Sequence, residues 1–222
     1  MTAAVTPANL EPGALAAGRR LFAGEWRFLG AAASMATLPP PRGIELAFAG
    51  RSNVGKSSLV NALTGRHALA RVSHTPGRTQ ELIFFAANEA WKLVDMPGYG
   101  YAAAPKAKVA AWTGLIHAYL RGRANLARVY VLIDARHGIK NADEPVFSLL
   151  DEAAVSYQAV LTKADEVGEA ALADCRAATA AALAKRKAAF PEVLATSSRT
   201  GSGLPELRAA MARVVAERTA RN

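Results

Sequence analysis

One segment, Gly50-Arg51-Ser52-Asn53-Val54-Gly55-Lys56-Ser57, matches the pattern G-x-x-x-x-G-K-S. It follows the apolar run 44–49, which predicts a buried strand, and it leads into residues 58–63, where apolar residues recur at helical spacing. A strand, a glycine-containing loop and a helix in this order form the context that a phosphate-binding loop requires. A turn that matches the pattern by chance is less favoured in this setting. The segment therefore predicts a nucleoside triphosphate site.

The residue types in this segment suit phosphate chemistry. Gly50 and Gly55 let the backbone bend so that successive N–H groups point inward and form an anion-binding nest at a helix N-terminus. Lys56 is expected to reach the β- and γ-phosphates, and the Ser57 hydroxyl to bind Mg²⁺. We expect nucleotide contacts from Gly50, Arg51, Ser52, Asn53, Val54, Gly55, Lys56, Ser57 and Ser58.

The composition predicts one globular domain. The chain has 222 residues, of which 51% are hydrophobic and 20% charged. A single cysteine, Cys175, excludes an internal disulfide framework and suits a reducing cytoplasm. No apolar run approaches the roughly 20 residues that cross a bilayer, and no secretory signal is evident, although a transit peptide is harder to exclude. We expect a cytoplasmic monomer.

The charge balance favours an anionic partner. Lys and Arg number 27 against 18 Asp and Glu, a net charge of +9. The simplest anionic partner is a nucleic acid. Two segments, 46–80 and 96–133, contain cations but no acid, and we favour an anion-binding surface over a merely solvated face. The cations are Arg51, Lys56, Arg66, Arg71 and Arg78, then Lys106, Lys108, Arg121, Arg123 and Arg128.

Two apolar runs, 82–85 and 91–94, predict an antiparallel hairpin. Asp95-Met96-Pro97-Gly98 follows the second run. A carboxylate at the C-terminal end of a strand faces the crevice above a parallel sheet, where it is well placed for a nucleotide's metal ion. The glycine leaves its N–H free to approach a γ-phosphate.

The rest of the chain alternates between helices and strands. We expect helices over 105–121, 141–154, 168–189 and 204–217, with strands over 129–134 and 193–196. Asp143 and Glu144 match the positive end of their helix, and we give them no catalytic role. The four histidines share no metal-ligand spacing. Residues 1–10 are expected to be disordered, and weak helical periodicity over 11–28 is broken by Gly18 and Gly24.

Thr162-Lys163-Ala164-Asp165 carries a specific chemistry. Guanine presents N1–H and a 2-amino group, two donors that one carboxylate accepts together, whereas adenine lacks that pair. The Lys163 stem is expected to lie over the base while its ammonium contacts the phosphate loop. A turn at Thr196, Ser197 and Ser198 is placed to direct a backbone N–H at guanine O6. An ATP-using kinase is an alternative, against which Asp165 argues.

Together these motifs resemble the translation-factor-related GTPases and, more narrowly, the EngB/YsxC-type (YihA) bacterial ribosome-assembly GTPases. The resemblance covers roughly 24–214, with Met96 where leucine is usual, and it does not extend to the first 20 residues. It rests on Ala49-Gly50-Arg51-Ser52-Asn53-Val54-Gly55-Lys56-Ser57-Ser58, Thr75-Pro76-Gly77-Arg78-Thr79-Gln80, Val94-Asp95-Met96-Pro97-Gly98-Tyr99-Gly100-Tyr101, Ile133-Asp134-Ala135-Arg136-His137 and Leu161-Thr162-Lys163-Ala164-Asp165.

The resemblance implies an α/β, three-layer P-loop GTPase fold, with a six-stranded, mostly parallel sheet, one antiparallel edge strand and helices on both faces. We expect a flexible N-terminal arm over 1–23, a single GTPase domain over 24–219 and a tail over 220–222. The resemblance also implies hydrolysis of GTP to GDP and phosphate with Mg²⁺, a switch role in large ribosomal subunit assembly through rRNA and ribosomal protein, and a need for the protein in cell division and septation.

The same matching assigns two switch segments, 75–81 and 95–104. Thr79 becomes the threonine that completes Mg²⁺ coordination beside Ser57, while Asp95 acts through water. Lys56, Thr79 and Gly98 become the catalytic residues. Further nucleotide contacts are expected from Gly77, Arg78, Thr79, Gln80, Glu81, Asp95, Met96, Pro97, Gly98, Thr162, Lys163, Ala164, Asp165, Thr196, Ser197 and Ser198.

Two features leave alternatives open. Related GTPases often carry glutamine after the D-x-x-G glycine to orient water; here Tyr99 stands there, so we expect slow intrinsic hydrolysis that a ribosomal particle accelerates. Asn53 either ligates K⁺, as in potassium-activated relatives, or only stabilises its loop. A competing function is a nucleotide-gated protein-binding module in division, with incidental hydrolysis. His137 is taken as structural.

Overall fold

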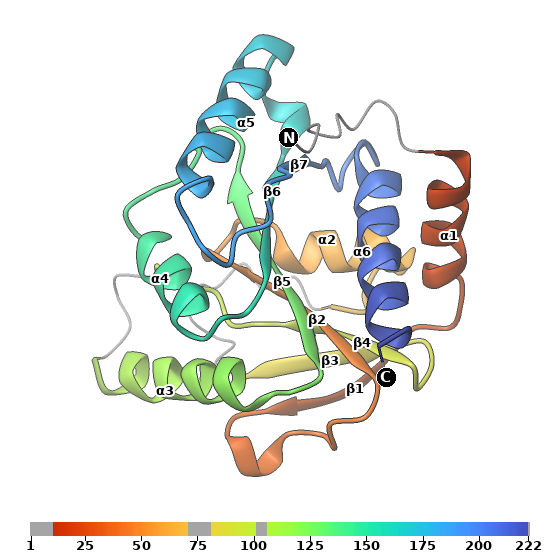
Figure 1. The fold of residues 1–222 in the computed structure, drawn as a ribbon, viewed down its shortest axis with the longest axis vertical. Coiled ribbons are helices and arrows are strands. Elements are labelled where there is room, and N and C mark those ends of the chain that lie inside the picture. The colour runs from red at the N-terminus through yellow and green to blue at the C-terminus, as the bar shows by residue number, and fades with distance from the viewer. Residues whose placement is uncertain (1–10, 71–80, 101–105, 222) are drawn as a thin grey trace.

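A computed structural model describes residues 11–70, 81–100 and 106–221, with backbone alone for 106–112. Its centre is a seven-stranded sheet in the order β1-β3-β4-β2-β5-β6-β7 (Figure 1). The strands are β1 (Arg27–Ala32), β2 (Ile44–Gly50), β3 (Leu82–Ala86), β4 (Trp91–Asp95), β5 (Leu126–Asp134), β6 (Tyr157–Thr162) and β7 (Leu194–Ala195). Strands β4, β2, β5, β6 and β7 run parallel, whereas β3 is antiparallel to β4 and to β1.

The predicted α/β class and the hairpin of β3 and β4 are confirmed, but the sheet has one strand more than the six expected. The antiparallel strand was expected at an edge, but the strand that runs antiparallel to its neighbours, β3, lies inside the sheet because β1 covers it. Gly30, Ala31 and Ala32 give β1 little intrinsic strand preference. The strand therefore depends on its partner, and Phe28 pairs opposite Phe85 with ring centroids 6.3 Å apart.

Six α-helices cover the two faces of the sheet in the described part of the chain. They are α1 (Pro12–Phe22), α2 (Lys56–Thr64), α3 (Lys106–Gly122), α4 (Glu144–Glu152), α5 (Glu169–Leu183) and α6 (Leu204–Thr219), with short 3₁₀ turns η2 (Met35–Thr37) and η3 (Ala164–Glu166). Helices α1, α2 and α6 share one core cluster, and α3, α4 and α5 share the other (Figure 1). This is the expected three-layer arrangement.

Helix α1 corrects one sequence prediction. Gly18, expected to break the helix, lies inside it. A Cβ at Gly18 would lie 2.6 Å from the backbone nitrogen of Ala209 in α6, so glycine is what allows the two helices to pack so closely. The interface continues at the end of α1, where Phe22 packs against Trp26 and Trp91. The arm and domain boundaries at residues 23 and 219 remain predictions.

Two cations assigned to an anion-binding surface are instead internal. Arg123 is 8% exposed and donates to both carboxylate oxygens of Glu45, which is fully buried, and to the Pro39 carbonyl. Tyr119 donates to the same carboxylate. Arg128 is also 8% exposed and lies 4.2 Å from the ring centroid of Phe190. A buried ion pair must be fully hydrogen-bonded to offset its desolvation. The contacts of Glu45 and Arg123 satisfy this need and bind the loop before β2 to the end of α3.

Two helices are shorter than predicted: α4 begins at Glu144, and α5 ends at Leu183. Leu115, Ile116 and Tyr119 are buried as expected in α3, whereas Val109 and Trp112 lie outside the described side chains. Among the helices of the described residues, none has the length and apolarity that crossing a membrane requires.

Candidate nucleotide-binding site

The predicted motifs meet at one edge of the sheet because each follows a strand that runs in the same direction. The glycine loop follows β2, Asp95 ends β4, Asp134 ends β5 and Thr162 ends β6. These four strands are parallel neighbours. The C-terminal edge of a parallel sheet is where open α/β folds bind ligands.

The glycine loop turns sharply into α2, which begins at Lys56. Gly55 has φ +105° and Asn53 has φ +63°, left-handed values that glycine and asparagine tolerate best. The Lys56 ammonium lies 3.4 Å from the Gly50 carbonyl, so it folds back over the loop. The result is a helix N-terminus with a cation held above it.

Asp95 and Ser57 form the polar floor of this loop. The Ser57 hydroxyl donates to Asp95 Oδ2 at 3.5 Å, while Asp95 Oδ1 is buried and has no hydrogen-bond partner among the described residues. Burial raises the pKa of Asp95 to about 6 against the attraction of Lys56, and burial lowers the pKa of Lys56. A hydroxyl and a carboxylate with a free oxygen are the ligand types that Mg²⁺ prefers. The pair therefore fits the predicted magnesium site.

The segment after Asp95 lies directly on the glycine loop. Ser52 N–H donates to the Tyr99 carbonyl at 3.0 Å, and Tyr99 N–H donates to the Gly50 carbonyl at 3.3 Å. A Cβ at Gly98 would lie 3.0 Å from the Lys56 ammonium nitrogen and 3.1 Å from Ser52. A larger residue at this position would make Lys56 or Ser52 shift by a few tenths of an ångström, so glycine suits the close approach of this segment to the loop.

The Tyr99 side chain is buried, with 6% of its surface exposed. Its hydroxyl donates to Asp143 Oδ1 at 2.8 Å, and Arg51 Nε lies 3.6 Å from the same oxygen. Asp143 is fully buried, and its second oxygen accepts from Lys140 N–H. Burial and the Asp143 carboxylate raise the pKa of Tyr99 well above its ordinary value. We name this contact set, Arg51, Tyr99 and Asp143, the Tyr99 anchor.

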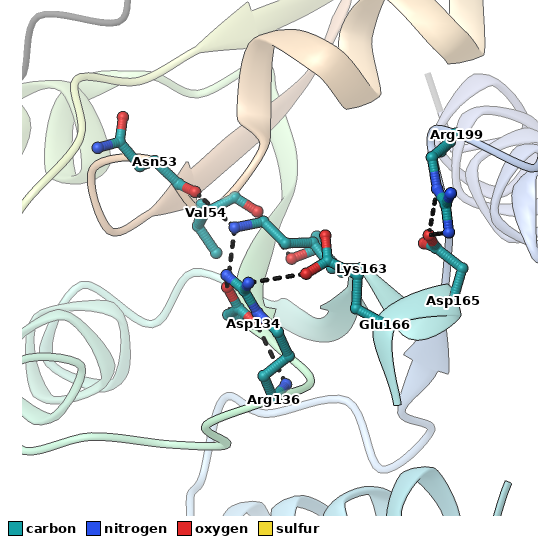
Figure 2. Close-up of polar contacts among 9 residues, drawn as sticks. Asn53, Val54, Asp134, Arg136, Lys163, Asp165, Glu166 and Arg199 are labelled. Carbon is teal, nitrogen blue, oxygen red and sulfur yellow. Dashed lines mark hydrogen bonds and ion pairs between the residues drawn. The ribbon is translucent and has the colours of Figure 1, made fainter. Parts of the chain in front are cut away.

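The T-K-A-D segment is tied to the glycine loop by two side chains. Thr162 Oγ1 donates to the Val54 carbonyl at 2.7 Å, and the Lys163 ammonium donates to the Asn53 carbonyl at 3.0 Å (Figure 2). The predicted contact between Lys163 and the phosphate loop is confirmed. Lys163 has φ +56°, and the closed geometry of this corner holds it in that conformation.

Asp134 gathers the cations around this corner. It accepts from Arg136 through both oxygens, at 2.9 and 2.7 Å, and from the Lys163 ammonium at 2.9 Å. Arg136 also donates to Glu166 at 2.7 Å (Figure 2). Although burial alone would raise it, the hydrogen bonds from Arg136 and Lys163 hold the pKa of Asp134 well below its usual range. This cluster fixes the T-K-A-D loop in place.

Asp165 lies at the far end of the same loop and is paired with Arg199 (Figure 2). Arg199 Nε and Nη2 lie 2.7 and 2.6 Å from Asp165 Oδ2. A cavity of about 320 Å³ opens between this pair and the glycine loop. Its lining includes Val54, Gly55, Ser58, Thr162, Lys163, Asp165, Ser198 and Arg199. Its residues come from the three motifs predicted to contact a nucleotide.

Many predicted residues do not line this cavity. Three of them line a neighbouring cavity, namely Arg51, Ser52 and Asn53, and eight line neither: Gly50, Lys56, Ser57, Glu81, Asp95, Pro97, Gly98 and Ala164. Met96 is buried in the hydrophobic core, and the hydroxyl of Thr196 donates to the Leu161 carbonyl. Ser197 is fully buried and holds the loop through Ser202 and Gly201. These three residues support the site from behind. Four others, Gly77, Arg78, Thr79 and Gln80, lie outside the described residues.

Sequence reasoning assigned no site role to Asp134, Arg136, Glu166 or Arg199. Asp134 carries a readable signal, because it is a carboxylate at the C-terminal end of a buried parallel strand. Arg199 carries none, since only the fold brings it to Asp165. His137 lines a neighbouring cavity of about 290 Å³ together with Arg51, Asn53 and Tyr99.

Comparison with known proteins agrees with this arrangement. A family model described as 50S ribosome-binding GTPase matches residues 45–163. The probable GTP-binding protein EngB of Rhodopseudomonas palustris strain BisB18 is 67% identical over 204 residues, covering 91% of this chain and 94% of that protein. The EngB protein of Nitrobacter hamburgensis is 65% identical over 202 residues, covering 90% and 93%.

Two solved structures share the fold. A probable GTP-binding protein engB aligns with a TM-score of 0.61 at 23% identity, over 78% of this chain and 99% of that one. Era in complex with MgGDPNP and a segment of 16S ribosomal RNA aligns with a TM-score of 0.61 at 20% identity, over 78% and 57%.

Proposed function

The chain belongs to the EngB family of GTP-binding proteins, a family of P-loop GTPases, and from this premise we propose that it binds GTP, hydrolyses it to GDP and phosphate, and acts as a switch in assembly of the large ribosomal subunit. The observation that carries the nucleotide part is the position of the glycine loop: Lys56 and Asp95 lie together where α2 begins, and Val54 and Gly55 of the same loop line the cavity that contains Asp165.

The phosphates are proposed to bind at the N-terminus of α2. There the loop amides and Lys56 offer donors to an anion, and α2 directs its positive dipole end at it. A phosphate beside Lys56 would also offset the cost of burying this ammonium, which already lowers its pKa. Gly98 approaches Lys56 closely enough to place its own N–H beside the same phosphate.

Mg²⁺ is proposed to be held by the Ser57 hydroxyl and, through water, by Asp95, with Thr79 as a further ligand from the resemblance. When bound, the ion neutralises charge on the phosphate oxygens. Ser57 and the free Oδ1 of Asp95 would position the ligands around the bound ion. The K⁺ role proposed for Asn53 is tested separately, by comparing GTPase rates in KCl and NaCl at matched ionic strength; equal rates reject it.

Intrinsic hydrolysis is proposed to be slow. A water-orienting group at position 99 would have to face the γ-phosphate, but the Tyr99 hydroxyl is donated to the buried Asp143. In the described residues Tyr99 therefore acts as an anchor for the second switch. An activating particle that rearranges this switch is the proposed source of faster turnover.

A ribosomal partner is proposed from the family and from charge. The net charge of +9 favours an RNA surface, and exposed cations remain after the buried Arg123 and Arg128 are removed from the count. They include Arg19, Arg20, Arg27, Arg42 and Arg121. Cytoplasmic location and a need in septation are proposed as consequences of this role; depletion of the protein should produce elongated, undivided cells.

Co-sedimentation with isolated large ribosomal subunits tests the switch. The protein is sedimented with a non-hydrolysable GTP analogue, with GDP, or with neither, alongside Lys56→Ala as a nucleotide-site control. Binding that needs the analogue, disappears in Lys56→Ala and weakens steeply with salt supports the proposal. Equal binding in all three states rejects a GTP switch. No binding in any state favours the alternative, a nucleotide-gated module that acts on a division protein.

A further inference from the structure

Arg199 and Asp165 form an ion pair at the mouth of the larger cavity. Two nitrogens of the guanidinium, Nε and Nη2, converge on a single oxygen, Asp165 Oδ2. The Arg199 side chain is 75% exposed, whereas that of Asp165 is 11% exposed. The carboxylate thus lies in the lining of the cavity, and the exposed arginine pairs with it, as Figure 2 shows.

The donor pattern of Arg199 resembles that of guanine. A guanidinium offers parallel N–H groups in a planar fork, and guanine offers N1–H and its 2-amino group along one edge. Both require the carboxylate of Asp165, and Arg199 already uses Oδ2 twice. The two partners cannot hold the carboxylate in full at the same time.

We propose that Arg199 competes with guanine for Asp165 and so sets how tightly, and how selectively, the site binds guanine nucleotides. This inference rests on the proposed function, because it takes Asp165 as the guanine-reading group. Guanine binding then includes an exchange, in which the base replaces Arg199 on the carboxylate and the guanidinium returns to solvent.

The loop that carries Arg199 is built for such an exchange. Its backbone is fixed by Ser197 N–H on the Ser202 carbonyl, Gly201 N–H on the Ser197 carbonyl, and Thr200 N–H on Ser197 Oγ. Arg136 offers a contrast, since it is held by Asp134 on one side and Glu166 on the other. Arg199 has one carboxylate partner among the described residues, so release breaks one exposed pair.

The competition acts on bases according to their donors. Guanine supplies both donors and replaces Arg199 in full. Hypoxanthine, which lacks the 2-amino group, supplies N1–H alone and replaces it only in part. Adenine lacks the pair and leaves Arg199 in place. Removing Arg199 should therefore help GDP most, inosine diphosphate less and ADP not at all.

The test is a titration of the full chain with GDP, inosine diphosphate and ADP at low and high NaCl. Arg199→Ala should bind GDP about two- to fivefold more tightly at low salt, the range expected for an exposed ion pair, and the gain should vanish at high salt. Arg199→Lys, which keeps the charge but loses the fork, should fall between. Arg213→Ala is the matched control, because it removes an exposed arginine that pairs with Glu192, a carboxylate 14% exposed and outside the cavity lining.

Two outcomes separate this inference from the proposed function. If wild type prefers GDP over ADP but Arg199→Ala binds GDP no more tightly, the competition is rejected and the guanine site stands. If wild type shows no preference for GDP, both are rejected. An independent readout is the ¹⁵N resonance of Arg199 Nε, whose N–H should lose its Asp165 contact on GDP addition; an unchanged resonance at saturation rejects the exchange.

Discussion

The two ends of the proposed nucleotide site are built from contacts of opposite character. At the phosphate end, residues 50–58 and 95–100, the decisive side chains are buried: Asp95, Tyr99 and the Asp143 that receives Tyr99. At the base end, residues 162–166 and 196–199, the carboxylates face solvent-exposed arginines. Breaking a buried polar contact costs much stability, whereas an exposed ion pair contributes little and is weakened by salt. The fold thus separates a buried end, to which we assign the phosphates, from an exposed end, to which we assign the base.

The largest effect is expected at the phosphate end, from Lys56→Ala. Loss of the ammonium removes charge-assisted hydrogen bonds to the phosphates, each worth about 1.5–3 kcal/mol, so affinity for GDP should fall about 100-fold. Calorimetric titration measures it. Lys185→Ala, an exposed lysine beyond the end of α5, serves as the control. A folded Lys56→Ala protein with undiminished affinity would contradict the phosphate assignment.

The next effect is structural and tests the Tyr99 anchor. Tyr99→Phe removes the donor to Asp143 Oδ1 and leaves that buried oxygen with Arg51 at 3.6 Å. The free energy of unfolding should fall by about 1–3 kcal/mol in urea titrations. Tyr157→Phe is the matched control, because the fully buried Tyr157 hydroxyl has no hydrogen-bond partner among the described residues, so its removal should cost little. Equal losses in the two variants would refute the anchor.

A smaller, pH-dependent effect is expected where the two ends meet, at Asp134. Its pKa is lower in the folded protein than in the unfolded chain, so its stabilising contribution is complete above about pH 4 and is lost as the pH falls below that value. At pH 7 the free energy of unfolding of Asp134→Asn should be about 1 kcal/mol lower than that of wild type. This value allows for solvent screening at Arg136 and Lys163. In urea titrations, the difference in free energy of unfolding between wild type and variant should shrink as the pH is lowered towards 2. A difference that stays constant with pH would show that charge is not its cause.

The smallest effect is expected from the exposed pair of Arg136 and Glu166 at the base end. Glu166→Gln removes one exposed partner, with side chains 37% and 43% exposed, so the melting temperature should shift by no more than about 2 °C. In 1 M NaCl, which screens the pair, scanning calorimetry should show no difference in melting temperature between wild type and variant. A larger, salt-independent loss would mean that the base end is as rigid as the phosphate end.

The sequence predicts the phosphate end better than the base end, for a physical reason. The glycine loop and Asp95 sit within short motifs whose local backbone dictates their chemistry, and the structure brings them together as expected. The partner of Asp165 is 34 residues away in the chain, and no local pattern marks it. The Tyr99 anchor could not be predicted from the sequence either, because Asp143 has the position of an ordinary acidic residue at the start of a helix.

Counting charges along the chain misplaced two cations for a related reason. An acid-free segment does not reveal a distant carboxylate, and Arg123 meets Glu45 across 78 positions. Gly18 teaches the same lesson for packing: glycine lowers helix propensity locally, but contact with α6 outweighs that cost. Strand β1 also depends on a partner, β3, rather than on its own residues.

The most direct test of the account is base selectivity measured on wild type and Asp165→Asn with GDP, ADP and xanthosine diphosphate. Xanthine carries a carbonyl where guanine has its 2-amino group, so an asparagine amide can donate to it where a carboxylate cannot. We predict that wild type selects GDP, and that Asp165→Asn loses roughly 10- to 100-fold of its GDP affinity while gaining affinity for xanthosine diphosphate. A wild type that binds ADP as tightly as GDP, or a variant that keeps its GDP preference, would contradict the proposed guanine-reading role of Asp165.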